Sequence, residues 1–308
     1  MDVFVTGATG TLGRPTVREL TASGIIVHGL ARSDRNELLL RELGANPVRL
    51  DLFDRRALEI AVKGRDAILH LATQIPPLKD AHRPGAWHEN DRLRADATRL
   101  LVDAALAGGV STLIYPSVCF FYPDRGDEWI EAAPPSDPPH LLRSTLAAEA
   151  EVARFTEAGG RGIVLRMGAF YSSSAPNTLH TLALARRGLA LMVGRADGFL
   201  SQIWVEDAAR ALVAALERAP AGTYDVVDDE PLTRGEIVRL IARAVGRRRL
   251  LVPPMFLVRL LAGKEGLFAA RSQRVSNRRF KEATGWTPTV KSAREGWARV
   301  AESARSVG

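Results

Sequence analysis

A glycine-rich segment near the N-terminus has the residue types and the spacing of a turn that binds phosphate groups. It reads TGATGTLG at residues 6–13 and overlaps the end of the apolar run VFVTG at residues 3–7. Gly7 permits a tight turn, Gly10 lets the backbone approach a pyrophosphate, and Gly13 lets the following helix pack closely on its strand. The N–H groups that begin this helix then face the phosphates. The residues predicted to bind a dinucleotide here are Gly7, Thr9, Gly10, Thr11, Leu12 and Gly13.

The end of the second predicted strand carries residues that can distinguish the two nicotinamide cofactors. A carboxylate at this point binds the adenine ribose hydroxyls and repels a 2′-phosphate, but residues 31–35 read ARSDR and place no acid at the first exposed positions. Arg32 can form a charge-assisted hydrogen bond to a 2′-phosphate, Ser33 can add a neutral one, and Arg35 is a second cation. The sequence therefore predicts NADPH/NADP as the cofactor, with NADH as the alternative.

The elements that must position these residues alternate along the chain. Short runs rich in Val, Ile and Leu are typical of strands at 3–7, 25–31, 47–52, 66–73, 111–117, 161–167 and 222–228. Helical patterns separate them at 12–23, 36–43, 91–107, 141–158 and 206–218. Strands spaced by helices in this way indicate the α/β class, with a doubly wound parallel-sheet Rossmann fold.

Two segments lack this alternation and have mainly helical patterns, residues 169–200 and 231–308. We predict that they form a smaller C-terminal lobe that binds the substrate over the carboxyl edge of the sheet, where ligands of doubly wound folds bind. The predicted NADP-binding Rossmann domain then comprises residues 1–168 plus about 201–230.

The composition of the 308-residue chain favours a globular enzyme and narrows its partners. The lone Cys119 excludes a disulfide framework, is expected to be a small buried hydrophobe, and leaves no metal site in the prediction.

No secretory signal is recognised, and the longest apolar stretch, 250–262, is too short to span a membrane, so we expect a cytoplasmic protein. From Arg234 onward, 17 Lys and Arg stand against 5 Asp and Glu, which we interpret mainly as solvated helix faces. The expected partner is a small-molecule substrate, without nucleic acid or membrane, for a monomer or homodimer.

Further motifs resemble those of the extended short-chain dehydrogenase/reductase family over most of the chain. Asp51-Leu52 resembles the pair that contacts adenine, and the HLA motif at 70–72 resembles the motif of the fourth strand beside the cofactor. Residues 166–168 occupy the place of the family's R-P-G after the sixth strand, and IWVEDAARALVAAL at 203–216 resembles its V-D-D-x-A helix. The further cofactor contacts implied by this resemblance are Asp51, Leu52, Leu71, Ala72, Thr73, Ser117, Met167 and Gly168.

The resemblance breaks at the catalytic residues. The family usually has a Tyr with a Lys four residues later, supported by a Ser and often an Asn, but none of the four tyrosines in this chain is followed by such a Lys. The segment LLRSTLAAEAE at 141–151 resembles the family's Y-x-x-S-K-x-x-x-E helix and puts Leu141 at the Tyr position and Thr145 at the Lys position. Val118 stands at the Ser position and Arg94 where Asn is common. The chain is therefore identified as an atypical member.

Chemistry without the usual acid needs another source of protons and a way to hold the substrate. Water, an acidic hydroxyl of the substrate or a side chain could supply the proton. The catalytic candidates are Ser117, Ser144 and Thr145, and the Tyr122 hydroxyl is a further possibility. The aromatic residues expected to stack on a flat substrate are Trp87, Phe120, Tyr122, Phe170, Tyr171 and Trp204.

The function predicted from the sequence is an NADPH-dependent ketoreductase that acts on a bulky, aromatic, polyketide-like secondary metabolite of antibiotic biosynthesis. Family reductases that lack the Tyr, among them angucyclinone ketoreductases, are similar in kind. Two alternatives stay open. One is a non-catalytic NADP(H)-binding sensor that uses the basic C-terminal lobe as an interaction face. The other is a nucleotide-sugar epimerase or dehydratase, which fits the fold but normally depends on the Tyr base.

Overall fold

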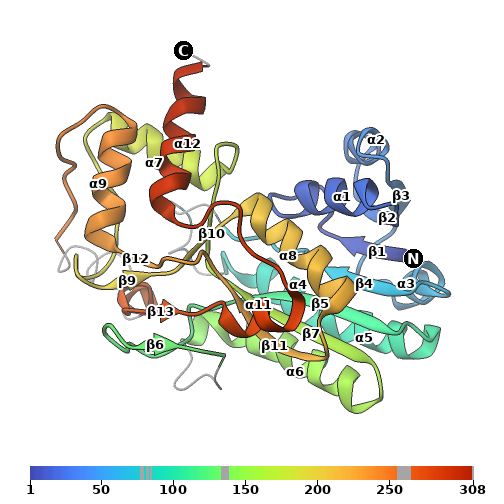
Figure 1. Cartoon of the computed structure of the whole chain (residues 1–308). Coiled ribbons are helices and arrows are strands. Elements are labelled where there is room, and N and C mark those ends of the chain that lie inside the picture. Colours follow the sequence, from blue (N-terminus) through green and yellow to red (C-terminus); the bar gives the residue numbers. More distant parts are fainter. Residues whose placement is uncertain (77–79, 81–82, 84, 133–138, 255–264, 307–308) are drawn as a thin grey trace.

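A parallel sheet of seven strands forms the centre of the molecule, in the order β11-β7-β5-β4-β1-β2-β3 (Figure 1). The computed structural model describes residues 1–76, 80, 83, 85–132, 139–254 and 265–306. The strands of the sheet are β1 (Asp2–Thr6), β2 (Ile26–Ala31), β3 (Asn46–Arg49), β4 (Ala67–His70), β5 (Thr112–Val118), β7 (Arg161–Met167) and β11 (Gly222–Val226). This order and the parallel pairing of all neighbours confirm the predicted doubly wound fold.

Helices cover both faces of the sheet. On one face lie α1 (Gly13–Ala22), α8 (Val205–Arg218) and α11 (Arg278–Thr284), and on the other lie α3 (Arg55–Val62), α5 (Asp96–Gly108) and α6 (Arg143–Glu157) (Figure 1). The strand β1 shows the consequence for the sequence, because Val3 and Val5 join the core on the α1 side while Phe4 joins the core on the other side. A strand buried on both faces needs a continuous apolar run, which is why VFV was recognisable. The helix α2 (Asp34–Glu42) packs on β2 and β3.

The helix predicted over 91–107 is divided in two, which corrects the expectation of one long helix. α4 (His88–Arg94) and α5 meet at Ala95, which separates the two helices. The Thr98 hydroxyl donates a hydrogen bond to the carbonyl oxygen of Arg94 one turn earlier, an arrangement that bends helices. The bend leaves Arg94 at the end of α4, with its side chain directed to β5.

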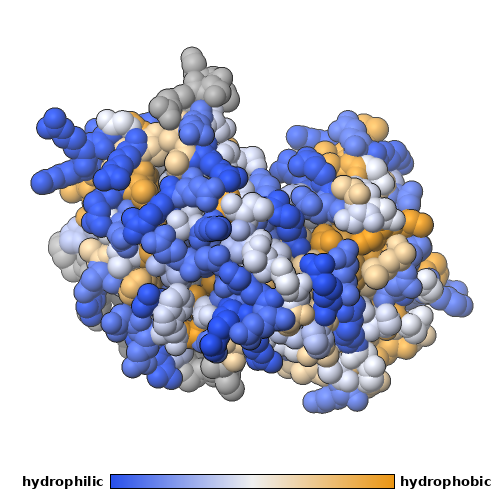
Figure 2. All heavy atoms as spheres, viewed as in Figure 1, coloured by the Kyte–Doolittle hydropathy of each residue, from blue (hydrophilic) through white to orange (hydrophobic). Residues whose placement is uncertain are grey.

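A second group of helices lies beyond the carboxyl ends of the parallel strands (Figure 1). It consists of α7 (Pro176–Arg186), α9 (Arg234–Ala244) and α12 (Ala293–Ser306), which share a core that includes Tyr171, Trp204 and Trp297. Figure 2 shows a notch between these helices and the edge that carries α1 and α2. The predicted division of the chain into two domains stays a prediction.

Short strands lie outside the main sheet, and four of them, β8, β9, β12 and β13, fall in segments that the sequence predicted to be mainly helical. β8 (Ala169–Tyr171) pairs with β10 (Gln202–Trp204), β9 (Phe199–Leu200) pairs with β12 (Leu232–Thr233), and β6 (Trp129–Ile130) pairs with β13 (Arg274–Val275). Each has only two or three residues, too few to show an alternating pattern. Two 3₁₀ helices, η1 (His140–Leu142) and η2 (Glu265–Ala270), complete the described elements.

Two predictions about single features can be checked against the fold. Cys119 is buried, as expected for a lone thiol, and burial raises its pKa. Within the described ranges, no helix is both long and apolar enough to cross a membrane.

Candidate functional site

The glycine turn is packed too tightly for side chains at two of its positions. Gly7 has a φ of +65°, and a Cβ there would lie 2.6 Å from the amide nitrogen of Ala72, two residues beyond the end of β4. A Cβ on Gly13 would lie 2.1 Å from the carbonyl oxygen of Gly7. The Gly10 amide donates to that same oxygen at 2.9 Å and closes the turn. The backbone therefore forms a cradle of the kind that holds a pyrophosphate at a helix N-terminus, and these residues fit a bound dinucleotide.

Three elements are joined directly behind the turn by Thr6 and His70. The Thr6 hydroxyl lies 2.7 Å from Nδ1 of His70, and Nε2 of His70 lies 2.9 Å from the carbonyl oxygen of Leu93. Burial lowers the pKa of His70 to about 4, so the ring is neutral and its Nε2–H donates to that carbonyl. Nδ1 then accepts from Thr6, and the Thr6 oxygen accepts from the amide of Ala72 at 3.3 Å. These hydrogen bonds link the ends of β1 and β4 to each other and to the helix α4.

The predicted 2′-phosphate contacts lie on the surface at the end of β2. Arg32, Ser33 and Arg35 are exposed, and no ion pair is found for either arginine in the described part of the chain. The neighbouring acid Asp34 is paired with Arg49 at 2.5 Å. Ser33 caps α2 by accepting from the amide of Asn36 at 3.3 Å, which leaves its own hydroxyl hydrogen for a ligand. Two free cations here suit a phosphate group.

The other predicted cofactor residues differ in exposure. Thr9 and Thr11 are half-buried, while Gly10, Asp51 and Thr73 are exposed. The Asp51 carboxylate accepts from the amide of Phe53 at 3.0 Å. Ala72 is half-buried, and the buried members of the set are Leu12, Leu52, Leu71, Ser117, Met167 and Gly168.

Ser117 lies in a row of polar side chains that crosses three strands. The register places Ser117 beside Arg166, and Arg166 beside Asp225. The Ser117 hydroxyl donates to Glu149 on α6 at 2.5 Å, and Arg166 donates to both oxygens of that carboxylate at 3.1 and 2.7 Å. Tyr122 accepts from Arg166 at 2.9 Å and donates to Asp225 at 2.8 Å. The hydroxyl hydrogens of Ser117 and Tyr122 are thus committed to carboxylates.

The buried surroundings of this row keep the phenol of Tyr122 neutral. Burial raises the pKa of Tyr122 far above its usual range and raises the pKa of Asp225 to about 7. Tyr122 is fully buried, which argues against the predicted stacking of its ring on a substrate. Glu149 and Asp225 were not predicted as site residues. Glu149 had a signal, because it is the last position of the motif Y-x-x-S-K-x-x-x-E, whereas Asp225 had none.

The helix α6 brings the two remaining catalytic candidates to β5 and α4. Ser144 donates to Asp91 of α4 at 2.6 Å. Thr145, at the family's Lys position, is buried beside the hydroxyl of Tyr115. That hydroxyl also accepts a hydrogen bond of 2.7 Å from Arg94, and the Tyr115 ring stacks on His70 with centroids 5.9 Å apart. Arg94, Tyr115 and Thr145 therefore meet where the family's usual pair would act.

The aromatic residues predicted to bind substrate separate into two groups. Trp87, Phe120 and Phe170 are half-buried, and Phe170 packs against the core beneath the glycine turn. Tyr171 and Trp204 instead belong to the core of the second helix group, with ring centroids 5.3 Å apart. Tyr122 is buried as well, and the role of the six rings in substrate binding stays a prediction.

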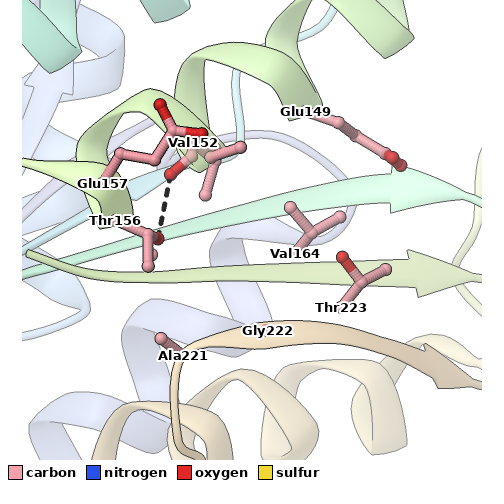
Figure 3. Close-up of a pocket in the computed structure, with 10 residues that line it drawn as sticks. Glu149, Val152, Thr156, Glu157, Val164, Ala221, Gly222 and Thr223 are labelled. Carbon is pink, nitrogen blue, oxygen red and sulfur yellow. Dashed lines mark hydrogen bonds between the residues drawn. The ribbon is translucent and has the colours of Figure 1, made fainter.

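A hollow of about 300 Å³ lies elsewhere, between α6 and the edge strand β11 (Figure 3). Glu149, Thr156, Val164 and Thr223 line it, and Thr156 donates to the carbonyl oxygen of Val152 at 3.1 Å. In the order of the sheet, β11 is separated from β1 by three strands. This hollow is therefore distinct from the site at the glycine turn.

The parallel sheet and the glycine cradle together define a Rossmann-type protein that binds NAD(P). The chain belongs to the NAD-dependent epimerase/dehydratase family, whose pattern matches residues 3–227. It is an NAD(P)-dependent oxidoreductase, and the family resemblance drawn from its motifs is confirmed.

Relatives with reductase names cover most of the chain. A 3-diazoavenalumate denitrifying reductase from a Streptomyces species is 32% identical over 97% of this chain and 100% of that protein. A 2-alkyl-3-oxoalkanoate reductase from Shewanella oneidensis is 27% identical over 79% of this chain and 66% of that protein. A human epimerase family protein solved with NADPH has the same fold, with a TM-score of 0.83 over 98% of this chain and 99% of that one, at 23% identity.

Proposed function

We propose that this oxidoreductase transfers hydride from NADPH to a bulky aromatic acceptor in a step that needs no proton from the protein. The observation that carries the proposal is the commitment of the two serine hydroxyls. Ser117 donates to Glu149 and Ser144 to Asp91, while the Thr145 hydroxyl is buried and has no hydrogen-bond partner among the described residues. Bound NADPH would supply the hydride, and the protein would hold the acceptor in place and stabilise the charge that forms.

The preference for NADPH rests on the end of β2. Arg32 and Arg35 are exposed cations without acidic partners in the described ranges, and Asp34 between them is paired with Arg49 at 2.5 Å. A 2′-phosphate bound here would meet two guanidinium groups and no free carboxylate. Charge-assisted hydrogen bonds of this kind are the strong ones.

The first acceptor we propose is an aromatic diazo compound with an oxygen on the neighbouring ring carbon. Its neutral quinone-diazide form accepts hydride at the diazo carbon, the C–N bond breaks with its electron pair on the departing N₂, and a phenolate remains. Atoms and charge balance without an acid, because a neutral acceptor plus hydride gives N₂ plus one anion. The full-length relative named as a denitrifying reductase of a diazo compound supports this choice.

A second acceptor is the one that the sequence suggested, an aromatic ketone with a hydroxyl beside the carbonyl. Hydride addition gives an alkoxide, and the neighbouring hydroxyl of the substrate supplies the proton. The relative named as a 2-alkyl-3-oxoalkanoate reductase supports reduction of an oxo group in this family. The half-buried rings of Trp87, Phe120 and Phe170 suit either aromatic acceptor.

The test is turnover by the purified protein with NADPH and two probes, 2-hydroxybenzenediazonium and 2-hydroxyacetophenone. For the diazo probe we expect one NADPH oxidised for each N₂ released, measured by absorbance and by mass spectrometry of the gas. A Gly13→Ala variant, whose cofactor cradle is obstructed, measures the background reaction. Tight NADP(H) binding without turnover of either probe would contradict the proposal and favour a sensor.

A further inference from the structure

Arg94 is a buried cation with no acidic partner in the described part of the chain. It is 5% exposed and makes one side-chain hydrogen bond, from Nη1 to the hydroxyl of Tyr115 at 2.7 Å. Other buried arginines are paired more fully. Arg166 contacts both oxygens of Glu149, and Arg234 donates to three backbone carbonyl oxygens. Arg94 alone of these three is left with most of its donors unused.

The groups described beside Arg94 carry no negative charge, although the Glu149 carboxylate of α6 acts electrostatically on its partner Tyr115. Tyr115 on β5 is neutral because burial raises its pKa, and His70 on β4 is neutral because burial lowers its pKa. Thr145 on α6 carries no charge. A guanidinium cannot release its proton in a protein, so it stays charged in this poorly solvated place. An anionic ligand would remove that cost.

The unused donors of Arg94 remain open to a ligand. Nε and Nη2 have no hydrogen-bond partner among the described residues, yet neither belongs to the side-chain atoms that are both enclosed and unpaired. They therefore keep some access to solvent although the residue is nearly buried. Two adjacent N–H groups of a guanidinium form a fork that matches an oxygen anion.

The position of Arg94 relates these donors to the reaction. In the chain's resemblance to its family, Arg94 stands at the Asn position and Thr145 at the Lys position, and β5 carries the Ser position at Val118. The structure brings Arg94 and Thr145 together around Tyr115. Arg94 is thus a permanent cation in the part of the site from which the Tyr-Lys pair is missing.

We propose that Arg94 binds the oxygen of the acceptor on which negative charge collects during hydride transfer. This inference rests on the proposed function and applies to both acceptors, since the diazo compound ends as a phenolate and the ketone passes through an alkoxide. Arg94 stabilises that oxyanion instead of protonating it. The protein has replaced a proton donor by a fixed positive charge, which explains how the reaction can proceed without Tyr and Lys.

The binding of 4-nitrophenol to the NADP⁺ complex tests this assignment without turnover. The ionised and neutral forms of this probe absorb at different wavelengths, so its pKa can be measured while it is bound. We expect the wild-type protein to lower that pKa by about one unit or more, equivalent to about tenfold tighter binding of the anion. Arg94→Gln should abolish the shift and Arg94→Lys should keep part of it. Arg92→Gln removes the charge of a half-buried residue of the same helix, which lies over the Phe53 ring and pairs with Glu89, and should leave the shift intact.

A wild-type comparison keeps the test decisive if Arg94→Gln does not fold. The NADP⁺ complex should bind 4-nitrophenolate about tenfold or more tightly than 4-nitroanisole, which has the same ring but no charge. Equal affinities would overturn the proposal, as would an unchanged pKa shift in a folded Arg94→Gln protein with normal NADP⁺ affinity. Failure of 4-nitrophenolate to bind would also overturn it.

Kinetics separate this proposal from the proposed function. With 2-hydroxybenzenediazonium and 2-methoxybenzenediazonium, kcat/KM should favour the hydroxyl compound in the wild-type protein, and the preference should disappear in Arg94→Gln. Turnover with no such preference would contradict the role of Arg94 and leave the reductase function standing. If the protein binds the anion through Arg94 but turns over neither substrate, the role of Arg94 in anion binding stands and the reductase function is contradicted.

Discussion

Hydrogen bonds between distant residues decide which protons are available at the candidate site. Ser117 and Glu149 are 32 positions apart, and Tyr122 and Asp225 are 103 positions apart, yet each pair shares a buried or part-buried hydrogen bond. A hydroxyl that already donates to a carboxylate must break this bond before it can protonate a substrate. These hydrogen bonds therefore favour a site that stabilises charge on the substrate over one in which Ser117 or Tyr122 donates a proton to it.

The glycine at the start of α1 gives the most direct prediction for a single residue. In Gly13→Ala the new Cβ would meet the Gly7 carbonyl oxygen at 2.1 Å, so the cradle must shift. We expect NADPH affinity to fall by about tenfold or more and the free energy of unfolding to fall by roughly 1–3 kcal/mol. Calorimetric titration and thermal denaturation measure the two effects. Gly108→Ala is the control, because a Cβ there makes only ordinary contacts, the nearest at 3.5 Å.

Arg32 gives a prediction about cofactor choice. Arg32→Glu should weaken NADPH binding by about tenfold or more and leave NADH binding nearly unchanged, because only NADPH carries the 2′-phosphate. Fluorescence titration with both cofactors checks this. Arg56→Glu makes the same charge change on the exposed surface of α3 and should alter neither affinity. Equal losses for both cofactors in Arg32→Glu would count against a 2′-phosphate contact.

Elements differed in how well the sequence predicted them. The central strands of the main sheet were recognisable because they are apolar runs, as in β1 and β4, and the glycine turn because its residues are neighbours. The break at Ala95 was missed because the hydrogen bond from Thr98 to the Arg94 carbonyl, which accompanies it, leaves no mark in the apolar pattern. The row through Arg166 and Asp225 was missed because strand register, not sequence spacing, joins its members.

The connection between the second helix group and the sheet depends on Tyr171 of β8. Its hydroxyl donates to the buried Asp228, just beyond β11, at 2.7 Å, and Asp228 also accepts from the amide of Trp204 at 3.3 Å. Tyr171→Phe should cost roughly 1–3 kcal/mol, because the carboxyl group loses a partner while it stays buried. Tyr224→Phe removes a longer bond, 3.2 Å to the carbonyl of Pro220, and should cost less than about 1 kcal/mol. Denaturant unfolding of both variants distinguishes these outcomes.

The pH dependence of stability belongs to the whole molecule, because two buried groups act on it with opposite signs. His70 has a folded pKa of about 4, below its usual 6.5, so the unfolded chain binds more protons between these values and acidification destabilises the fold. Asp225 has a folded pKa of about 7, above its usual 3.8, so the folded chain binds more protons across that range. Its contribution to stability is present at low pH and is lost as the pH rises toward 7.

Removing one of the two groups should therefore expose the effect of the other. In Asp225→Asn the gain on acidification disappears, and stability should fall more steeply than in the wild-type protein as the pH drops from 6.5 to 4. Relative to wild type, this variant should gain roughly 3–4 kcal/mol between pH 4 and pH 7. His70→Gln should have the opposite effect on the pH dependence of the free energy of unfolding, because the variant lacks the imidazole ring whose protonation destabilises the wild-type fold at low pH. Urea unfolding at several pH values measures both slopes, and parallel curves for wild type and Asp225→Asn would show that Asp225 does not titrate in this range.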